Sequence, residues 1–271
     1  MSFLPKDIFQ KLYKEIPNHI ESDTEVAFYF LSYLLNKYND PDVALKTFKK
    51  TIKVDSDKSM SIRSFLIGSI SQSISTASNV LESEDVLSAI SCLKKLGVKI
   101  VKTKPQSYKI YGKGLGSLFA KKNLTLNFGN SGTLARLLLG ILSTTTNIEI
   151  KVQGDHSLNK RSMEKLIKLM SEFGAEFLPK NKFNFPLKII STEMPIGINY
   201  KSGVSAQLKS AAILAGLNAF GNTEIIETEK SRDHTENMLL QNSSSIKVIK
   251  GKIPSSETCP DIFAIFTGPL N

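Results

Sequence analysis

Hydrophobic and polar positions follow a pattern that recurs three times along the chain. In each copy a short apolar strand leads through a small polar loop into an apolar helix and a second strand, and an amphipathic helix and further strands follow. The first strands are expected at 52–54, 124–128 and 197–200, and the second strands at 76–80, 148–152 and 223–228. The pattern predicts an α/β domain of three βαβαββ units over residues 51–240.

The two flanking segments do not share this pattern. Residues 1–50 contain two amphipathic helical stretches, so we predict a helical N-terminal extension, whose role the sequence does not reveal. Residues 241–271 follow the third copy, and we expect them to form either the start of a truncated second domain or an irregular tail.

Composition narrows the class of protein. Of the 271 residues, 41% are hydrophobic and 22% are charged, which is the balance of a globular protein. We expect no membrane partner, because no apolar run approaches the ~20 residues that a membrane helix needs. The N-terminal segment has neither a secretory nor a transit pattern, so the predicted location is cytoplasmic. Isolated cysteines and histidines predict neither a disulfide nor a metal site.

The net charge of +10 raises the question of a nucleic-acid partner. Only four of the 35 basic residues are arginines, and the lysines are spread along the chain, so we expect no nucleic-acid binding. Guanidinium groups form planar bidentate contacts with phosphate or carboxylate that lysine does not reproduce. The arginines therefore indicate the candidate site: Arg63, Arg136, Arg161 and Arg232.

The basic residues recur at similar places in the three copies. Arg63 lies four residues after Ser59, Arg136 follows Ser131, and Lys209 lies four residues after Ser205, each at the start of an apolar helix. A helix N-terminus presents free amides and a positive dipole end, which favour an anion. We predict that the three loops converge on one pocket for phosphate or carboxylate groups.

Five motifs carry a resemblance to a known family. In order they are "DKSMSIR", "GNSGTLAR", "GDHSLNKRSM", "SGVSAQLKSA" and "KSRDHTENML". Together they resemble the 5-enolpyruvylshikimate-3-phosphate synthase family of the shikimate pathway, which leads to chorismate and the aromatic amino acids. The resemblance implies transfer of an enolpyruvyl group from phosphoenolpyruvate to shikimate 3-phosphate with release of phosphate. It also implies two similar domains, each made of three βαβαββ units around buried helices, and no cofactor.

The resemblance assigns roles to particular residues. Lys58 is expected to be catalytic and to contact both substrates. The residues implied for shikimate 3-phosphate are Lys58, Ser59, Arg63, Ser205, Ala206, Gln207 and Arg232. Those implied for phosphoenolpyruvate are Lys58, Gly132 and Arg161, and those implied to shape the glycine loop are Asn130, Ser131, Thr133 and Arg136.

The resemblance covers about one of the family's two domains. In the family the other domain supplies proton-transferring carboxylates, a lysine and further arginines. The sequence therefore predicts a truncated enzyme with low or no activity alone, with a complementing second domain on another chain as a candidate partner.

Two other interpretations stay open. One is the UDP-N-acetylglucosamine enolpyruvyl transferase of the same fold, although "GDHSLNKR" lacks that enzyme's cysteine and Lys58-Ser59 replaces its Lys-Asn. The other is a non-catalytic anion-binding relic domain whose partner would bind residues 1–50.

Overall fold

The computed structural model describes residues 56–227, 229–240, 246–251 and 262–267. The chain divides into two units, 1–55 and 56–271, and the described residues all belong to the second. The helices predicted within 1–50 and the strand predicted at 52–54 lie outside the described residues.

Three small sheets repeat one topology. In the second and third sheets the first strand pairs in parallel with the second strand, and the remaining pairs are antiparallel. The first sheet, as far as it is described, has the same order of its last three strands. This recurrence confirms two complete βαβαββ units and, over its described strands, the first one. The sheet orders are β1(Ile74–Ser78)-β3(Ser107–Tyr111)-β2(Lys99–Lys104), β4(Thr125–Asn127)-β5(Glu149–Gln153)-β7(Leu187–Ile190)-β6(Glu176–Leu178), and β8(Asn199–Ser202)-β9(Thr223–Glu227)-β11(Ile262–Thr267)-β10(Ile246–Gly251).

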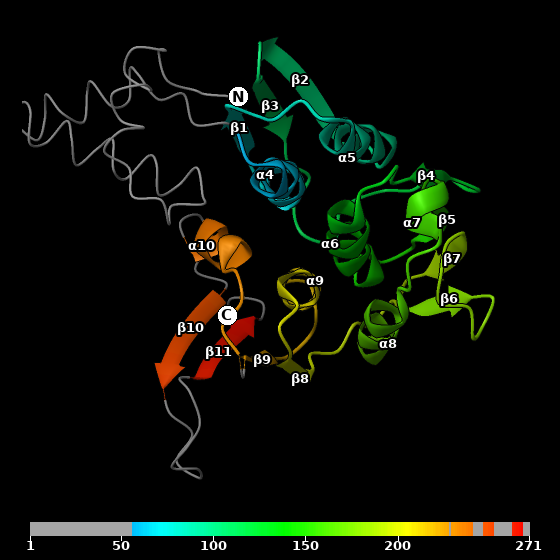
Figure 1. Cartoon of the computed structure of the whole chain (residues 1–271), viewed down its shortest axis with the longest axis vertical. Coiled ribbons are helices and arrows are strands. Elements are labelled where there is room, and N and C mark those ends of the chain that lie inside the picture. The colour runs from blue at the N-terminus through cyan, green and yellow to red at the C-terminus, as the bar shows by residue number, and fades with distance from the viewer. Residues whose placement is uncertain (1–55, 228, 241–245, 252–261, 268–271) are drawn as a thin grey trace, which may run out of the picture. The chain divides into compact units, whose positions relative to one another are not determined.

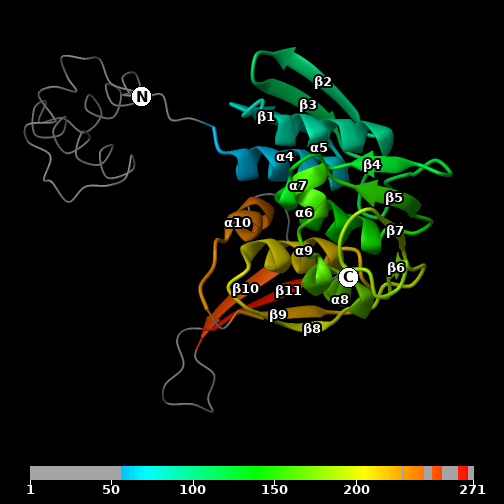
Figure 2. The same cartoon turned by 45° about the vertical axis from the view of Figure 1, so that its right-hand side comes forward.

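The first helix of each unit is buried. These helices are α4 (Lys58–Ile70), α6 (Gly132–Ser143) and α9 (Ala206–Gly216), and they occupy the interior while the sheets lie outside them (Figures 1 and 2). In α6 every residue except Arg136 is buried, which explains why its sequence is apolar on all faces. The second helices are amphipathic and lie nearer the surface: α5 (Glu84–Lys95), α8 (Glu164–Glu172) and α10 (His234–Leu240), with the short α7 (His156–Asn159) before α8.

The third unit extends past the boundary that the sequence analysis placed at residue 240. β11 pairs with β9, and β10 pairs with β11, so both strands from the 241–271 segment belong to the third sheet. Without them the third unit would lack the two final strands that the first two units have. In the described part of the chain, no helix is long and apolar enough to cross a membrane.

Helices α6 and α9 pack directly against each other. A Cβ atom at Gly140 would lie 2.6 Å from the carbonyl oxygen of Ala211 and 3.0 Å from its Cα. Backbone atoms cannot move aside as a flexible side chain does, so the absence of a side chain at Gly140 sets how near the two buried helices approach.

We predict that Gly140→Ala lowers the free energy of unfolding by about 1–3 kcal/mol, as overpacking in a core does. The direction of the change tests the packing argument, because replacing glycine by alanine in an unobstructed helix would raise the free energy of unfolding by ~0.5–1 kcal/mol. Urea unfolding of the variant measures the change. Gly203→Ala is the control, since a Cβ there meets nothing within 4 Å; an unchanged or increased stability of Gly140→Ala would contradict the packing argument.

Candidate functional site

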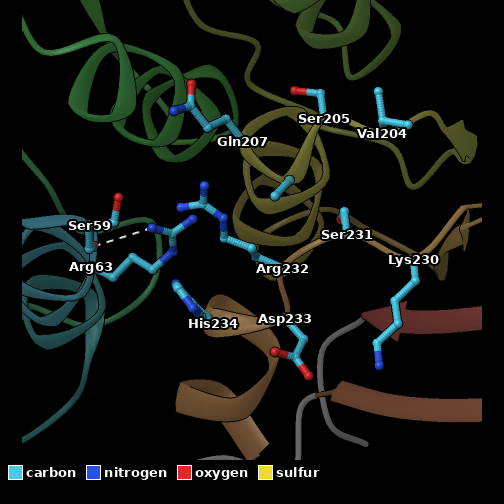
Figure 3. A pocket seen from close by; sticks show the side chains of 11 residues that line it. Ser59, Arg63, Val204, Ser205, Gln207, Lys230, Ser231, Arg232, Asp233 and His234 are labelled. Carbon is cyan, nitrogen blue, oxygen red and sulfur yellow. Dashed lines mark hydrogen bonds between the residues drawn. The ribbon is translucent and has the colours of Figure 1, made fainter. Parts of the chain in front are cut away.

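A cavity of about 690 Å³ opens at the N-terminal ends of α4 and α9. Its walls come from the first turn of α4, the start of α9 and the segment that leads into α10 (Figure 3). Eleven residues line it: Ser59, Arg63, Val204, Ser205, Ala206, Gln207, Lys230, Ser231, Arg232, Asp233 and His234.

Arg63 is the most buried cation of this cavity. Its side chain is held by neutral groups from three elements: Nε donates to Thr235 Oγ1 at 2.8 Å, Nη1 to the carbonyl of Ser59 at 3.2 Å and Nη2 to Ser210 Oγ at 3.3 Å. The residue is only 3% exposed. Burial lowers the pKa of its guanidinium below the ordinary value, and the nearby Glu236 opposes that shift.

Arg232 lies beside Arg63, and its positive charge further lowers the Arg63 pKa. In Figure 3 the two guanidinium groups lie next to each other, below Gln207. Neither forms an ion pair with a described carboxylate. Two adjacent guanidinium groups without carboxylate partners create a strongly positive cavity wall, which favours a multiply charged anion.

The N-terminus of α9 forms another part of the cavity wall. Ser205 caps the helix, because its hydroxyl oxygen accepts a hydrogen bond from the amide N–H of Leu208 at 3.4 Å. The amides of Ala206 and Gln207 belong to the first turn, where a helix has no internal acceptors for them. This end of α9 therefore adds hydrogen-bond donors and a positive dipole end to the cavity.

A second basic cluster surrounds the N-terminus of α6. Arg161 Nη2 donates to Asn130 Oδ1 at 2.9 Å, and Arg136 Nη1 donates to the carbonyl of Gly132 at 3.1 Å. Burial lowers the pKa of Arg136, and the charge of Arg161 lowers it further. Ser131 caps the helix by accepting the amide of Leu134.

Gln207 links the cavity to this second cluster. Its amide oxygen accepts from Arg136 Nη1 at 3.0 Å, and its amide nitrogen donates to Thr133 Oγ1 at 3.0 Å. Because Gln207 also lines the cavity, the two groups of predicted site residues are neighbours in the fold.

Comparison with known proteins agrees with the geometry. A family model described as EPSP synthase (3-phosphoshikimate 1-carboxyvinyltransferase) matches residues 44–254. The chain belongs to the EPSP synthase family. This membership selects the first of the enolpyruvyl transferase interpretations raised by the sequence.

Individual relatives show the same similarity. A 3-phosphoshikimate 1-carboxyvinyltransferase of Paramagnetospirillum magneticum is 38% identical over 196 residues, which are 72% of this chain and 44% of that protein. One from Streptococcus agalactiae serotype V is 42% identical over 197 residues, 72% of this chain and 45% of that protein. The solved EPSP synthase of Acinetobacter baumannii has a TM-score of 0.68 at 34% identity, covering 80% of this chain and 46% of that one. The chain thus spans about half the length of the relatives it matches.

The EPSP synthase resemblance assigned seven residues to shikimate 3-phosphate, and six of them line the cavity together. The seventh, Lys58, is absent from its lining. Its Nζ instead forms an ion pair with Asp85 of α5 at 2.8 Å, and its side chain is 50% exposed. Lys58 has a long flexible side chain in the first turn of α4, next to Ser59, so rotation of that side chain would be needed to bring its ammonium to the cavity.

Lys209 differs from the expectation of three equivalent cations. Arg63 and Arg136 both bond the carbonyl four residues earlier, at the site end of their helices. Lys209 Nζ instead bonds Glu227 and Glu236 in the interior. The spacing in the sequence correctly placed Lys209 four residues after Ser205. It did not reveal that Glu227 and Glu236, which lie in later elements, pair with the ammonium of Lys209 and neutralise it.

Five cavity residues were not among the predicted ligands: Val204, Lys230, Ser231, Asp233 and His234. The signal for them was proximity in sequence, because each lies inside or beside a motif that supplied a predicted ligand. Within the described ranges, no group of three histidine, cysteine, aspartate or glutamate side chains is arranged to hold a metal ion.

We predict that Thr235→Val lowers the free energy of unfolding by about 1–3 kcal/mol, because it removes the acceptor of the buried Arg63 Nε–H while keeping the side-chain shape. Thr103→Val is the control: its hydroxyl bonds Ser107 at 3.3 Å on an exposed strand, so that change should stay within ~0.5 kcal/mol. Denaturant unfolding compares the two. If both variants lost the same free energy of unfolding, the Arg63–Thr235 hydrogen bond would contribute no more to stability than the exposed one.

Proposed function

We propose that this cavity binds shikimate 3-phosphate, and that the chain is the substrate-binding domain of a 3-phosphoshikimate 1-carboxyvinyltransferase. The proposal rests on one observation, namely which of the basic side chains form ion pairs with carboxylates. Every ion pair among the described side chains uses lysine, whereas Arg63 and Arg232 line the cavity and form no ion pair with a described carboxylate. A ligand with a phosphate and a carboxylate supplies the anions that these two groups lack.

The ligand would lie across the cavity with its two charged ends apart. Its phosphate would bond Arg232, the first-turn amides of α9 and the hydroxyl of Ser205, which can donate while it accepts the amide of Leu208. Its carboxylate would bond Arg63. Gln207 would contact the ring hydroxyls, and its bonds to Thr133 and Arg136 would fix its orientation.

Phosphoenolpyruvate would bind at the neighbouring cluster. Gly132 and Arg161 lie there, and Lys58 would reach both substrates after leaving Asp85. In the reaction the substrate hydroxyl oxygen adds to C2 of phosphoenolpyruvate while C3 gains a proton, and the hydroxyl proton passes to a base. Loss of phosphate and of a proton from C3 then restores the double bond in the product.

Both steps need a positioned acid and base. The buried Glu227 and Glu236 are engaged by Lys209, and Asp233 immediately precedes α10. Because the chain spans about half the length of its relatives, we propose that a second domain outside the described residues supplies these groups.

Arg232→Lys is expected to weaken binding of shikimate 3-phosphate by about tenfold, since a point charge replaces a bidentate fork and one charge-assisted hydrogen bond is lost. The net charge is unchanged, so the loss would report geometry. Isothermal calorimetry on the folded chain measures it; an affinity equal to that of the unchanged chain would remove Arg232 from the site and leave the proposal without the guanidinium that it assigns to the phosphate.

Gly132→Ala is expected to weaken phosphoenolpyruvate binding more than shikimate 3-phosphate binding. The new Cβ would lie 2.8 Å from Arg136 Nη1, so that guanidinium must shift, and it would lie 3.4 Å from Arg161 Nη1, in direct contact with the other predicted phosphoenolpyruvate ligand. Titrating each ligand, with phosphoenolpyruvate added to chain saturated with shikimate 3-phosphate, separates the two effects. The same loss for both ligands would indicate general damage to the loop.

A further inference from the structure

The buried ion cluster of the third unit is not explained by the ligand contacts alone. Lys209 of α9 is fully buried, and its Nζ lies 2.8 Å from Glu227 Oε1 at the end of β9 and 2.6 Å from Glu236 Oε1 in the first turn of α10. Both glutamates are also buried. One ammonium group thus joins three elements behind the cavity.

The two glutamates flank, in sequence, one segment of the cavity wall. The segment between them contributes five of the eleven lining residues: Lys230, Ser231, Arg232, Asp233 and His234. At its first end, Glu227 Oε1 accepts the amide of Ser231 at 2.7 Å as well as the ammonium of Lys209. The position of Glu227 therefore determines where the chain starts to cross the cavity, one residue before Arg232.

At the second end of the segment, Glu236 influences the orientation of Arg63 through the neighbouring Thr235. Glu236 is adjacent to Thr235, whose hydroxyl accepts Arg63 Nε at 2.8 Å and donates to Ser210 Oγ at 2.8 Å. Holding the first turn of α10 against α9 through Lys209 and Glu236 thus also holds the acceptor that orients the Arg63 guanidinium.

Stability is a weak explanation for such a cluster. Removing three charges from water costs several kcal/mol per ion, and apolar or neutral groups of similar volume are often as stable or more so. In addition, the second oxygen of Glu236 is buried without a hydrogen-bond partner in the described part of the chain. The cluster is therefore better explained by the geometry that it imposes on the two arginines.

We infer that Lys209 is a positioning residue of the anion site: through Glu227 and Glu236 it fixes both ends of the 229–235 segment and so places Arg232 and Arg63. The inference rests on the proposed function for the identity of the anion. The geometric part, that the cluster fixes the segment, stands on the free chain.

Two variants test it. Glu227→Gln keeps the side-chain shape and removes one charge; the triple variant K209M/E227Q/E236Q removes all three charges together, so that no buried charge is left unpaired. Each is expected to bind shikimate 3-phosphate about tenfold more weakly, ~1.4 kcal/mol, while circular dichroism shows a folded chain. Glu164→Gln is the matched control, because Glu164 pairs with Lys168 on the exposed face of α8, and it should leave the affinity unchanged.

Amide hydrogen exchange in the free chain distinguishes local opening of the 229–235 segment from a loss of global stability. The Ser231 amide should be protected in the unchanged chain, and Glu227→Gln should speed exchange in 229–235 while leaving α6 as protected as before. An unprotected Ser231 amide in the unchanged chain, or a folded variant with unaltered affinity, would overturn the inference.

The experiment separates the two proposals. If the unchanged chain fails to bind shikimate 3-phosphate, the proposed function falls, and exchange in 229–235 then decides the positioning role alone: faster exchange in Glu227→Gln supports it, and equal exchange overturns it. If the unchanged chain binds and the folded variants bind equally well, the proposed function stands and the positioning role falls.

Discussion

Close packing of three buried helices is the constraint on which the rest of the structure depends. α6 approaches α9 to the point where Gly140 leaves no space for a Cβ atom beside Ala211. The same packing brings the N-terminal ends together, so that Arg63 of α4 bonds Ser210 of α9, and Thr133 of α6 bonds Gln207 of α9. Three helix termini from three repeats thus become neighbours, and their polar first turns can share one ligand region.

The placement of charges makes this region favourable for anions. The ion pairs of the described chain join acidic side chains to lysines, as in Lys58–Asp85 and Lys209–Glu227, while Arg63 and Arg136 are held by hydroxyls, carbonyls and an amide. Arg63 is held by neutral groups, and its burial disfavours the charged form more than the nearby Glu236 and Asp57 favour it, which is unfavourable in the free protein. Binding of the proposed anion would remove that disadvantage, so part of the binding energy would be set by the folded chain before the ligand arrives.

The sequence predicted the repeats and the helix termini because both are local patterns. Apolar runs identify α4, α6 and α9, and serines with nearby cations identify the ends where Ser59, Gly132 and Ser205 lie. Contacts between distant residues were not predictable in this way. The spacing of Lys209 matched that of Arg63, but Glu227 and Glu236 neutralise it, and Asp85 similarly engages Lys58. The strands β10 and β11 were missed because the repeat was ended at the last strong motif, and only their pairing with β9 shows where they belong.

The most direct test of the account compares two ligands on the unchanged chain by calorimetry: shikimate 3-phosphate and shikimate, which lacks the phosphate. Because Arg232 and the α9 terminus would bind the phosphate, saturable binding of shikimate 3-phosphate should be at least about tenfold tighter than that of shikimate. Binding should also weaken as salt is added. Equal affinity for the two ligands, or no binding of either by a folded chain, would contradict the assignment of this cavity as the shikimate 3-phosphate site.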